Sequence, residues 1–448
     1  MSEPLPAETP VYDLIGIGFG PSNLALAIAV AEHNAGLPGP PVTAHFLERQ
    51  PDFGWHRGML IDDATMQVSF LKDLVTLRNP SSHYSFVNYL HEQGRLIDFI
   101  NHKSLFPLRV EFHDYFAWAA AQVDAQVSYG AEVIAVRPVR DADGDPAHHA
   151  ASDVTHLDVV ARVGGETVTH RARNIVVSTG LRPKLPEGVS ASERLWHTSD
   201  LLRNAAKLRA GAAPRRMLVV GAGQSAAESV AYLHREFPDA EVCAVFSRYG
   251  YSPADDSPYA NRIFDPAAVD DFYTAPEATK QRLMDYHANT NYSVVDIDLI
   301  TDLYRREYQE KVLGRQRLRM INASRLTAVH EGPGGVDATV TSLVTGEVTH
   351  LDADIVVYAT GYHPADPYSL LGEVGALCHR DGLGRPVVGR DYRAQADASL
   401  RCGVYLQGGT EHSHGITSPL LSNTAVRVGE VLSSVLADHR APTLVAAV

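Results

Sequence analysis

Two segments far apart in the chain repeat one arrangement, and this repetition limits the folds that the chain can adopt. Each is a short apolar run, a glycine-rich turn and a helical pattern: "VYDLIGIGFGPSNLALAIAVAEH" from Val11 and "RRMLVVGAGQSAAESVAYLHREF" from Arg215. This order is typical of the strand, turn and helix that open a doubly wound α/β unit. Further short apolar strands alternate with helical patterns, which indicates mainly parallel sheets. We therefore predict an α/β protein with two Rossmann-like, dinucleotide-binding domains.

The first turn carries a G-x-G-x-G pattern at the start of its helix, in Gly16, Gly18, Gly20, Pro21, Ser22 and Asn23. Glycines permit a tight turn and let a pyrophosphate approach the backbone, while the helix N-terminus supplies N–H donors and a positive dipole. The third glycine usually stands where Pro21 is, and proline suits a first helical turn because its missing N–H is not needed there. Glu48, at the end of the next strand, is placed to bind a ribose diol.

The second turn has the G-x-G-x-x-A form, in Gly221, Gly223, Gln224, Ser225 and Ala226. The strand that follows ends in Ser247 and Arg248 instead of an acidic residue. An acid there would bind the ribose of NAD, whereas an arginine accommodates the phosphate of NADP. Arg248 could also be an ordinary surface residue. Together the two turns suggest FAD plus NADPH, and "IVVSTG" and "DIVVYATGY", which both end a strand with Thr-Gly, are typical of flavoproteins with two such domains.

The composition narrows the range of partners. The 448 residues favour two or three domains, and a net charge of −14 provides no basic field for nucleic acid or an anionic membrane. The opening "MSEPLPAETP" lacks the features of a signal peptide, and the longest apolar run is too short to span a bilayer, so we expect a cytoplasmic protein. We expect no disulfide framework, zinc knuckle or dithiol centre from three widely separated cysteines, Cys243, Cys378 and Cys402. No metal is expected at "EHSHG" either, because the spacing of Glu411, His412 and His414 matches no strong metal motif.

Three stretches interrupt the strand and helix pattern. Residues 141–153 are polar and predict a hairpin tip, and residues 207–216 predict a linker into the second unit. Residues 265–314 have helical periodicity and few strand signals, which predicts a helical subdomain.

The stretch "MQVSFLKDLVTLRNP", 66–80, looks meant for burial, yet it contains Lys72 and Asp73. A lysine is almost never fully buried unless a group pairs with it. Lys72 could pair with Asp73, or its stem could lie on apolar surface while its ammonium reaches water.

Two branches of the two-nucleotide flavoproteins fit poorly. Disulfide reductases need a redox-active cysteine pair, and general flavin monooxygenases carry F-x-G-x-x-x-H, where Glu193 replaces the glycine four residues before His197. Over nearly its whole length the chain instead resembles the N-hydroxylating flavin monooxygenases of siderophore biosynthesis, the ornithine and lysine N-monooxygenases. The resemblance rests on the order of several stretches: "GIGFGPSNLALA", "FGWHRGM", "MQVSFLKDLVTLRNPSSHYSFVNYL", "GAGQSAAE", "DDSPYANRIFDP", "NTNYSVV", "ATGYHP" and "HGITSPLLSNTAVR".

The resemblance implies an FAD-binding domain made from both ends of the chain, 1–206 and 350–448. It implies an NADPH-binding domain at 207–264 and 315–349, and it makes the helical stretch 265–314 a substrate-binding subdomain. The positions that match cofactor contacts of the family are Trp55, His56, Gln67, Gln224, Ser225, Arg248, Thr360, Gly361 and Ser422. The positions that match its substrate contacts are Lys72, Asn261, Asn291 and Gln67, and Asn291 also matches a catalytic asparagine where nicotinamide and substrate meet.

The resemblance also implies the chemistry. NADPH would reduce FAD, dioxygen would add to give a flavin hydroperoxide, and the neutral side-chain amine would take the distal oxygen. Asn261 would be a suitable neutral partner in a dry site, although it could equally cap the helix that begins at "RIFDPAAV". We expect L-ornithine as the substrate, because its carboxylate would complete an ion pair with Lys72 and because "TLRNPSSHYSFVNYL" is closest to the ornithine enzymes.

Several alternatives remain open from the sequence. The substrate could be L-lysine or a diamine such as putrescine or cadaverine, and an amine oxidase would need no NADPH. A flavoprotein that binds both nucleotides without catalysis is also compatible with these patterns. We expect a homo-oligomer, a tetramer or a dimer.

Overall fold

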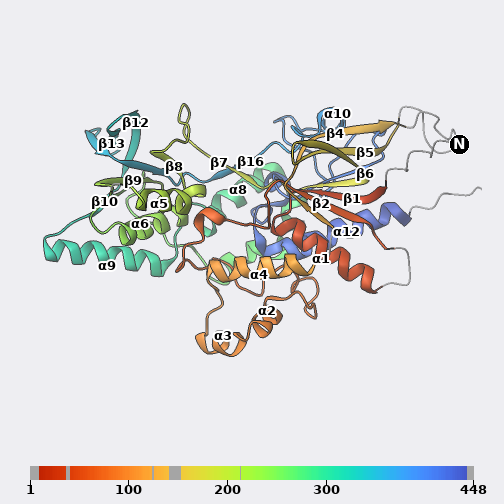
Figure 1. The fold of residues 1–448 in the computed structure, drawn as a ribbon, viewed down its shortest axis with the longest axis horizontal. Helices are drawn as coiled ribbons and strands as arrows, with labels where there is room; N and C mark the ends of the chain where they lie inside the picture. Colours follow the sequence, from red (N-terminus) through yellow and green to blue (C-terminus); the bar gives the residue numbers. More distant parts are fainter. Residues whose placement is uncertain (1–9, 37–40, 124–125, 141–152, 212, 441–448) are drawn as a thin grey trace, which may run out of the picture.

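The computed structural model describes residues 10–36, 41–123, 126–140, 153–211 and 213–440, which form two α/β units joined side by side (Figure 1). The predicted hairpin tip at 141–153 lies almost entirely outside the described residues. The fold class is confirmed, because each unit is a largely parallel sheet with helices packed against it.

The sheet of the first unit has the order β3-β2-β1-β6-β5-β4, with β17 added beside β6. Its strands are β1 (Val11–Ile17), β2 (Ala44–Glu48), β3 (Val127–Tyr129), β4 (Ala131–Arg140), β5 (Val154–Val163), β6 (Glu166–Val177) and β17 (Gly403–Leu406). The pairs of β1 with β2 and β6, and of β17 with β6, are parallel, whereas β5 pairs antiparallel with β4 and β6. The C-terminal segment therefore completes the sheet that the N-terminal segment begins.

Helices α1 (Pro21–Gly36) and α12 (Thr424–Arg440) lie side by side against this sheet (Figure 1). The residues of α1 from 24 to 30, "LALAIAV", are all less than 5% exposed. A helix that is apolar on every side is stable only when its surroundings bury it on every side. Because α1 is held in this way, its N-terminus is fixed at the carboxyl edge of the sheet.

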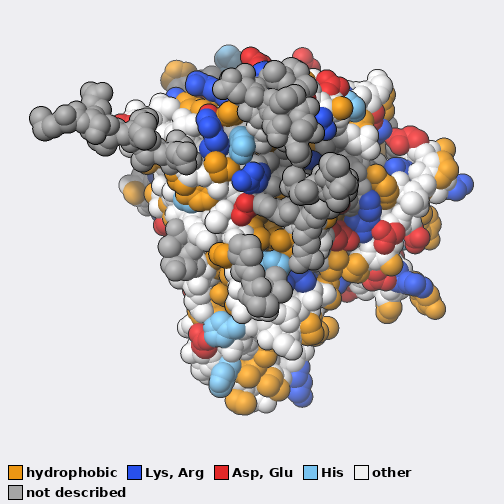
Figure 2. Space-filling view, turned by 90° about the vertical axis from the view of Figure 1, so that its right-hand side faces the viewer, with side chains coloured by type: hydrophobic (Ala, Val, Ile, Leu, Met, Phe, Trp, Pro, Cys, Tyr) orange, Lys and Arg blue, Asp and Glu red, His pale blue; other side chains and the backbone are white. Residues whose placement is uncertain are grey.

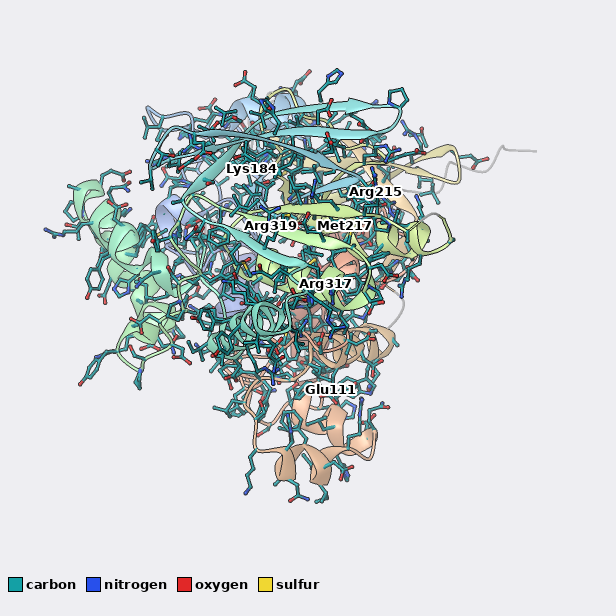
Figure 3. The ribbon with its side chains drawn as sticks, turned by 90° about the vertical axis from the view of Figure 1, so that its left-hand side faces the viewer. Glu111, Lys184, Arg215, Met217, Arg317 and Arg319 are labelled. Carbon is teal, nitrogen blue, oxygen red and sulfur yellow. The ribbon has the colours of Figure 1, made fainter. Side chains whose placement is uncertain are left out.

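The sheet of the second unit has the order β11-β10-β9-β15-β8 and is parallel throughout. Its strands are β8 (Leu195–His197), β9 (Arg216–Val220), β10 (Glu241–Val245), β11 (Leu318–Ile321) and β15 (Ile355–Tyr358). Helices α5 (Leu201–Arg209), α6 (Gln224–Glu236) and α9 (Ile297–Leu313) share a core with this sheet, and an antiparallel sheet shares a second core with it, formed by β12 (Ser324–Gly332), β13 (Gly335–Ser342) and β14 (Val348–Ala353). Figure 3 looks at this end of the molecule, with Met217 of β9 and Arg319 of β11 among the strands and Glu111 of α4 below them.

The sheet pairing differs from the predicted boundaries at two places. β8 precedes residue 207, α5 begins before it, and β15 follows residue 350, yet all three belong to the second unit. The sequence assigns them to the first unit because a short buried strand has no mark of the sheet it joins. The units are also linked by an antiparallel ribbon of β7 (Leu181–Pro183) and β16 (Tyr362–Pro364).

The helical interpretation of 265–314 is confirmed, but its helices separate. α7 (Pro266–Thr274) contacts α11 (Glu411–His414) of the first unit, whereas α9 packs on α6 and β11. α8 (Glu277–His287) lies between them in the chain. The linker interpretation of 207–216 is only partly right, because α5 runs to Arg209 and β9 begins at Arg216.

The remaining helices lie mostly at the edges of the first unit. α2 and α3 project from its body, and α4 packs on α1 (Figure 1). The remaining helices are α2 (Phe86–Glu92), α3 (Leu96–His102), α4 (Arg109–Gln122) and α10 (Gly372–Leu377). Short 3-10 turns occur in both units and between them: η1 (Arg57–Met59), η2 (Thr198–Asp200), η3 (Ala260–Phe264), η4 (Ala288–Thr290) and η5 (Leu421–Asn423). None of the helices in the described part of the chain has the length and apolarity needed to cross a membrane. Acidic and basic side chains are interspersed on the end of the first unit that Figure 2 shows.

Residues 66–80 form turns and bends that are only partly buried. Leu71 is 45% exposed and Leu77 is 42% exposed, so these two positions were wrongly expected to be buried. Leu74 and Val75 are buried as expected, and Lys72 is half-buried.

One of the two sequence interpretations paired Lys72 with Asp73, and that interpretation was wrong, because the Asp73 carboxylate bonds to other groups. Its Oδ1 accepts hydrogen bonds from the backbone N–H of Val75 (2.9 Å) and Thr76 (2.7 Å). Its Oδ2 accepts from the Thr76 hydroxyl (3.0 Å) and from the backbone N–H of Phe86 (2.8 Å). This buried carboxylate thus fixes the turn that presents Lys72.

We predict that Asp73→Ala destabilises the first unit by about 2–4 kcal/mol, because it leaves buried N–H groups without acceptors. Asp62→Ala, at an exposed position shortly before this stretch, should leave stability nearly unchanged. Thermal unfolding of the two variants checks this, and equal melting temperatures would contradict the role assigned to Asp73.

Candidate functional site

The two glycine turns make the same close contact. A Cβ atom on Gly18 would lie 2.4 Å from the backbone oxygen of Ser178, and one on Gly221 would lie 2.4 Å from the backbone oxygen of Ala359. Gly18 has φ +85° and Gly221 has φ +144°, so any side chain would also be strained there. Ser178 and Ala359 each directly precede the Thr-Gly pair that the sequence singled out. The neighbouring strand end therefore presses on each turn, and only glycine fits.

The first turn leaves open space where a phosphate would approach. Nothing lies within 4 Å of a Cβ built on Gly20, and α1 begins at Pro21 with its free backbone N–H groups. Glu48 is 6% exposed beside this turn. Its Oε2 accepts from the Phe19 N–H (2.7 Å) and its Oε1 from the Gln50 N–H (2.9 Å). Each oxygen keeps a further lone pair for a ribose hydroxyl.

Asn23 and Ser22 are linked to the C-terminal part of the chain. The Asn23 amide donates to the backbone oxygen of Gly18 (2.6 Å) and accepts from Gln407 Nε2 (2.9 Å). The Ser22 hydroxyl accepts from Arg427 Nη2 (3.2 Å). Asn23 therefore shapes the turn from within.

Several buried polar atoms beside this turn have no hydrogen-bond partner among the described residues. They are Gln407 Oε1, Ser422 Oγ, Asn423 Oδ1 and Nδ2, and Arg427 Nε. Such atoms are costly when unpaired and are usually satisfied by a ligand or water. A dinucleotide with ribityl hydroxyls, phosphates and a ring bearing carbonyl groups would supply partners, so the residues fit FAD. Sequence reasoning included Ser422 but gave no role to Asn423 and Arg427, although both lie in the quoted stretch "HGITSPLLSNTAVR", and Gln407 lies outside all the quoted stretches.

The segment that follows β2 contains Trp55, His56 and Gln67. Trp55 is half-buried against the edge of Phe116 (ring centroids 5.3 Å apart), and His56 lies 4.7 Å from Trp55. His56 has φ +50°, a backbone conformation that favours glycine and often marks functional sites. The residue as a whole is exposed, but desolvation by the protein atoms around its ring, together with the Arg109 charge, lowers the pKa of His56 to about 4, so the ring is neutral near pH 7. The Gln67 side chain is also exposed.

In the second turn the side chain of Gln224 points to protein groups. Its Nε2 donates to Glu228 Oε1 (3.0 Å), and its Oε1 accepts from the backbone N–H of Asp296 (2.8 Å). Gln224 thus joins the turn to the segment that follows Asn291. Ser225, the next residue of α6, is half-buried.

Arg248 is exposed at the carboxyl end of β10, and its Nη1 donates to the backbone oxygen of Ser293 (2.7 Å). It therefore lies against the loop that carries Asn291 and is anchored there. Thr360 and Gly361 leave β15 for the ribbon, where the Thr360 hydroxyl donates to the Lys184 backbone oxygen and the Gly361 backbone oxygen accepts from His197 (2.9 Å).

Lys72 lies beside η3, the turn that carries Asn261. The Lys72 ammonium lies 5.6 Å from the centre of the Phe264 ring, one turn along η3 from Asn261. Burial lowers the pKa of Lys72, and attraction to Asp265 opposes that shift. No described carboxylate lies within 4.0 Å of the ammonium. Asn261 donates to the backbone oxygen of Asp256 (2.7 Å) and does not cap α7, whose N-cap is Asp265, so the capping interpretation was wrong.

Asn291 follows η4 in a loop that reaches the first unit. The next residue, Tyr292, donates a hydrogen bond from its hydroxyl to Glu411 Oε1 (2.8 Å). Burial raises the pKa of both Glu411 and Tyr292. Within the described ranges no group of three or more His, Cys, Asp or Glu is placed to hold a metal, and His412 and His414 bond to the backbone oxygens of Pro386 and Arg390.

The chain matches one protein family along most of its length. The family of L-lysine 6-monooxygenases and L-ornithine 5-monooxygenases matches residues 10–364. An L-ornithine N(5)-monooxygenase of Pseudomonas aeruginosa is 38% identical over 97% of this chain and 96% of its own length. The same enzyme of Burkholderia cepacia is 41% identical over 90% of each chain.

A solved structure has the same architecture. The ornithine N-hydroxylase of Kutzneria sp. 744, in complex with reduced FAD, NADP+ and L-ornithine, has a TM-score of 0.89 and 47% identity, over 96% of this chain and all of that chain. The family match, the two relatives and this likeness all cover most of the chain. The chain therefore belongs to the L-lysine 6-monooxygenase/L-ornithine 5-monooxygenase family.

Proposed function

We propose that this chain is an FAD- and NADPH-dependent monooxygenase that hydroxylates the side-chain amine of L-ornithine with dioxygen. The observation that carries the choice of substrate is the half-buried Lys72 ammonium, which has the Phe264 ring beside it and no described carboxylate within 4.0 Å. An amino-acid carboxylate would complete this ion pair. The similarity to three ornithine hydroxylases supports the same choice.

The residues divide between the two nucleotides. The first turn, Glu48 and the unpaired buried atoms of η5 and α12 would hold FAD, and the second turn with Arg248 would hold NADPH. When bound, FAD supplies the activation of dioxygen after reduction by NADPH. The contribution of the protein is to bind, orient and desolvate the reactants.

The amine must lose its proton before it reacts, and its ordinary pKa is about 10.4 if it is lysine-like. A site with amide and carbonyl groups at the amine end, and with its positive charge at the carboxylate end, favours the neutral amine. The neutral side chain of Asn291 is assigned to the amine end of the substrate. Lys72 supplies the positive charge beside η3, the turn that also carries the neutral Asn261.

A lysine or diamine substrate is the second candidate. Lysine is one methylene longer, a difference worth only about 1–3 kcal/mol in a pocket. Putrescine has no carboxylate for Lys72.

We further propose that the product serves hydroxamate siderophore or related biosynthesis in the cytoplasm, and that the enzyme is a dimer or tetramer. Light scattering of the purified protein tests its oligomeric state.

We predict that Arg248→Ala raises the apparent Michaelis constant for NADPH about tenfold or more and leaves the apparent Michaelis constant for NADH nearly unchanged. A charge-assisted contact to phosphate contributes about 1.5–3 kcal/mol, and NADH has no such phosphate. Steady-state kinetics with both nucleotides checks this. Arg248→Lys is the matched variant, which keeps the charge and should lose less, whereas equal losses with NADH and NADPH would remove the phosphate role.

Asn291→Ala should divert reducing equivalents into hydrogen peroxide. We expect this because Asn291 is assigned to the point where nicotinamide and substrate meet, so its loss exposes the oxygenated cofactor before the amine reacts. The ratio of hydroxylamine formed to NADPH consumed measures the effect. Asn289→Ala, at an exposed position two residues earlier, is the control. An unchanged ratio in Asn291→Ala would reduce this asparagine to a loop residue.

Lys72→Ala should raise the apparent Michaelis constant for L-ornithine about tenfold or more, because the substrate carboxylate loses its charged partner. Flavin content and the rate of FAD reduction by NADPH should persist. Lys280→Ala is the matched control, since its ammonium also lies beside aromatic rings, 5.8 Å from the centre of Phe272. If the Lys72 variant keeps its ornithine constant, the carboxylate role is lost.

A further inference from the structure

Arg109 and Glu228 form a buried ion pair that joins the two units. Arg109 is the first residue of α4 in the first unit, and Glu228 lies on α6 of the second unit (Figure 1). Arg109 Nη2 lies 2.6 Å from Glu228 Oε1, and Nη1 lies 2.8 Å from Oε2. The two side chains are 12% and 5% exposed. Two parallel hydrogen bonds in a low-dielectric environment fix both the distance and the angle between the units.

The pair extends toward the flavin-lining segment on one side. Arg109 Nη1 also donates to the backbone oxygen of Met59 (3.0 Å), and Nη2 to that of Thr65 (3.4 Å). Both acceptors lie between His56 and Gln67. The guanidinium therefore holds the backbone of the segment that was assigned to the flavin.

On the other side the pair reaches the second glycine turn. Glu228 Oε1 accepts from Gln224 Nε2 (3.0 Å), and Gln224 Oε1 accepts from the Asp296 N–H (2.8 Å). Gln224 opens α6 at the turn, and Asp296 follows the loop of Asn291. One continuous set of hydrogen bonds thus connects the flavin segment, the nucleotide turn and the Asn291 loop.

We propose that the Arg109–Glu228 pair positions the nicotinamide of NADPH against the flavin for hydride transfer. The pair touches neither cofactor; it acts through the backbone of 56–67 and through Gln224. The proposal rests on the FAD and NADPH part of the proposed function and is independent of which amine is hydroxylated. Hydride transfer requires the two rings in one geometry, and a shift of about 1 Å can lower a rate by up to about a hundredfold.

Anaerobic stopped-flow reduction of the FAD-loaded enzyme by saturating NADPH, without any amine, tests this. Glu228→Gln keeps the size of the side chain and removes its charge. We expect its reduction rate to fall roughly ten- to hundredfold, with FAD content unchanged. After chemical reduction with dithionite, the same variant should react with dioxygen at the wild-type rate, because that step needs no nicotinamide.

A matched control comes from a second ion pair, between α6 and the segment that contains Met59 and Thr65. Arg235, at the other end of α6, pairs with Asp63, and their side chains are 37% and 65% exposed. Arg235→Gln should reduce FAD at the wild-type rate. If Arg235→Gln slows FAD reduction as much as Glu228→Gln does, breaking any ion pair of α6 slows this step. The buried pair would then have no special positioning role, and the proposal would be overturned.

The double variant Arg109→Met, Glu228→Met separates positioning from stability. Replacing a buried ion pair with apolar side chains of similar size commonly preserves stability. We expect its melting temperature to stay near that of the wild type while FAD reduction stays slow. If the double variant, or Glu228→Gln, reduces FAD at the wild-type rate, the pair is only structural. Because no amine is present, an incorrect assignment of ornithine would leave this result unchanged, whereas it would abolish the Lys72 effect.

Discussion

The contact between each glycine turn and the neighbouring strand end sets the geometry of both nucleotide sites. The Ser178 oxygen faces Gly18 in the first unit, and the Ala359 oxygen faces Gly221 in the second. Each contact lies at the carboxyl edge of a parallel sheet, where the helix that follows begins. Because the strands are hydrogen-bonded, the turn, the helix N-terminus and the Thr-Gly segment move as one body. The further features of the site are placed relative to these two edges.

Sequence patterns predicted both edges because the motifs that mark them are local, although the strand ends that leave room only for glycine at Gly18 and Gly221 come from far along the chain. Gly18, Gly221 and the strand and helix around each are all visible in short windows, and so is Glu48 at the end of the next strand. The assignment of β8 and β15 to the second sheet was not predictable, since their partners lie far away in the chain. The Arg109–Glu228 pair was missed for the same reason. Glu228 closes the quoted stretch "GAGQSAAE", but Arg109 lies in none of the quoted stretches, and only the fold brings the two side chains together.

The stretch around Lys72 shows where sequence reasoning about charge fails. Asp73 was an evident partner by adjacency, but its carboxylate serves four donors of its own turn and of the start of α2. This leaves the Lys72 ammonium beside η3, which carries Asn261. The lysine thus stays half-buried, with Asp265 attracting it from a distance and no described carboxylate within 4.0 Å, which is the observation on which its proposed role toward a substrate carboxylate rests.

In the proposed function, the Lys72 charge selects an amino acid by its carboxylate, and the substrate's side-chain amine is hydroxylated in its neutral form. The most direct measurement compares L-ornithine, L-lysine and putrescine with the purified FAD-loaded enzyme, following NADPH consumed and hydroxylamine formed for each. We expect hydroxylamine close to the NADPH consumed with L-ornithine, a lower ratio with L-lysine, and little product with putrescine. Equal yields from putrescine and L-ornithine, or no hydroxylamine from any of the three, would contradict the proposed function.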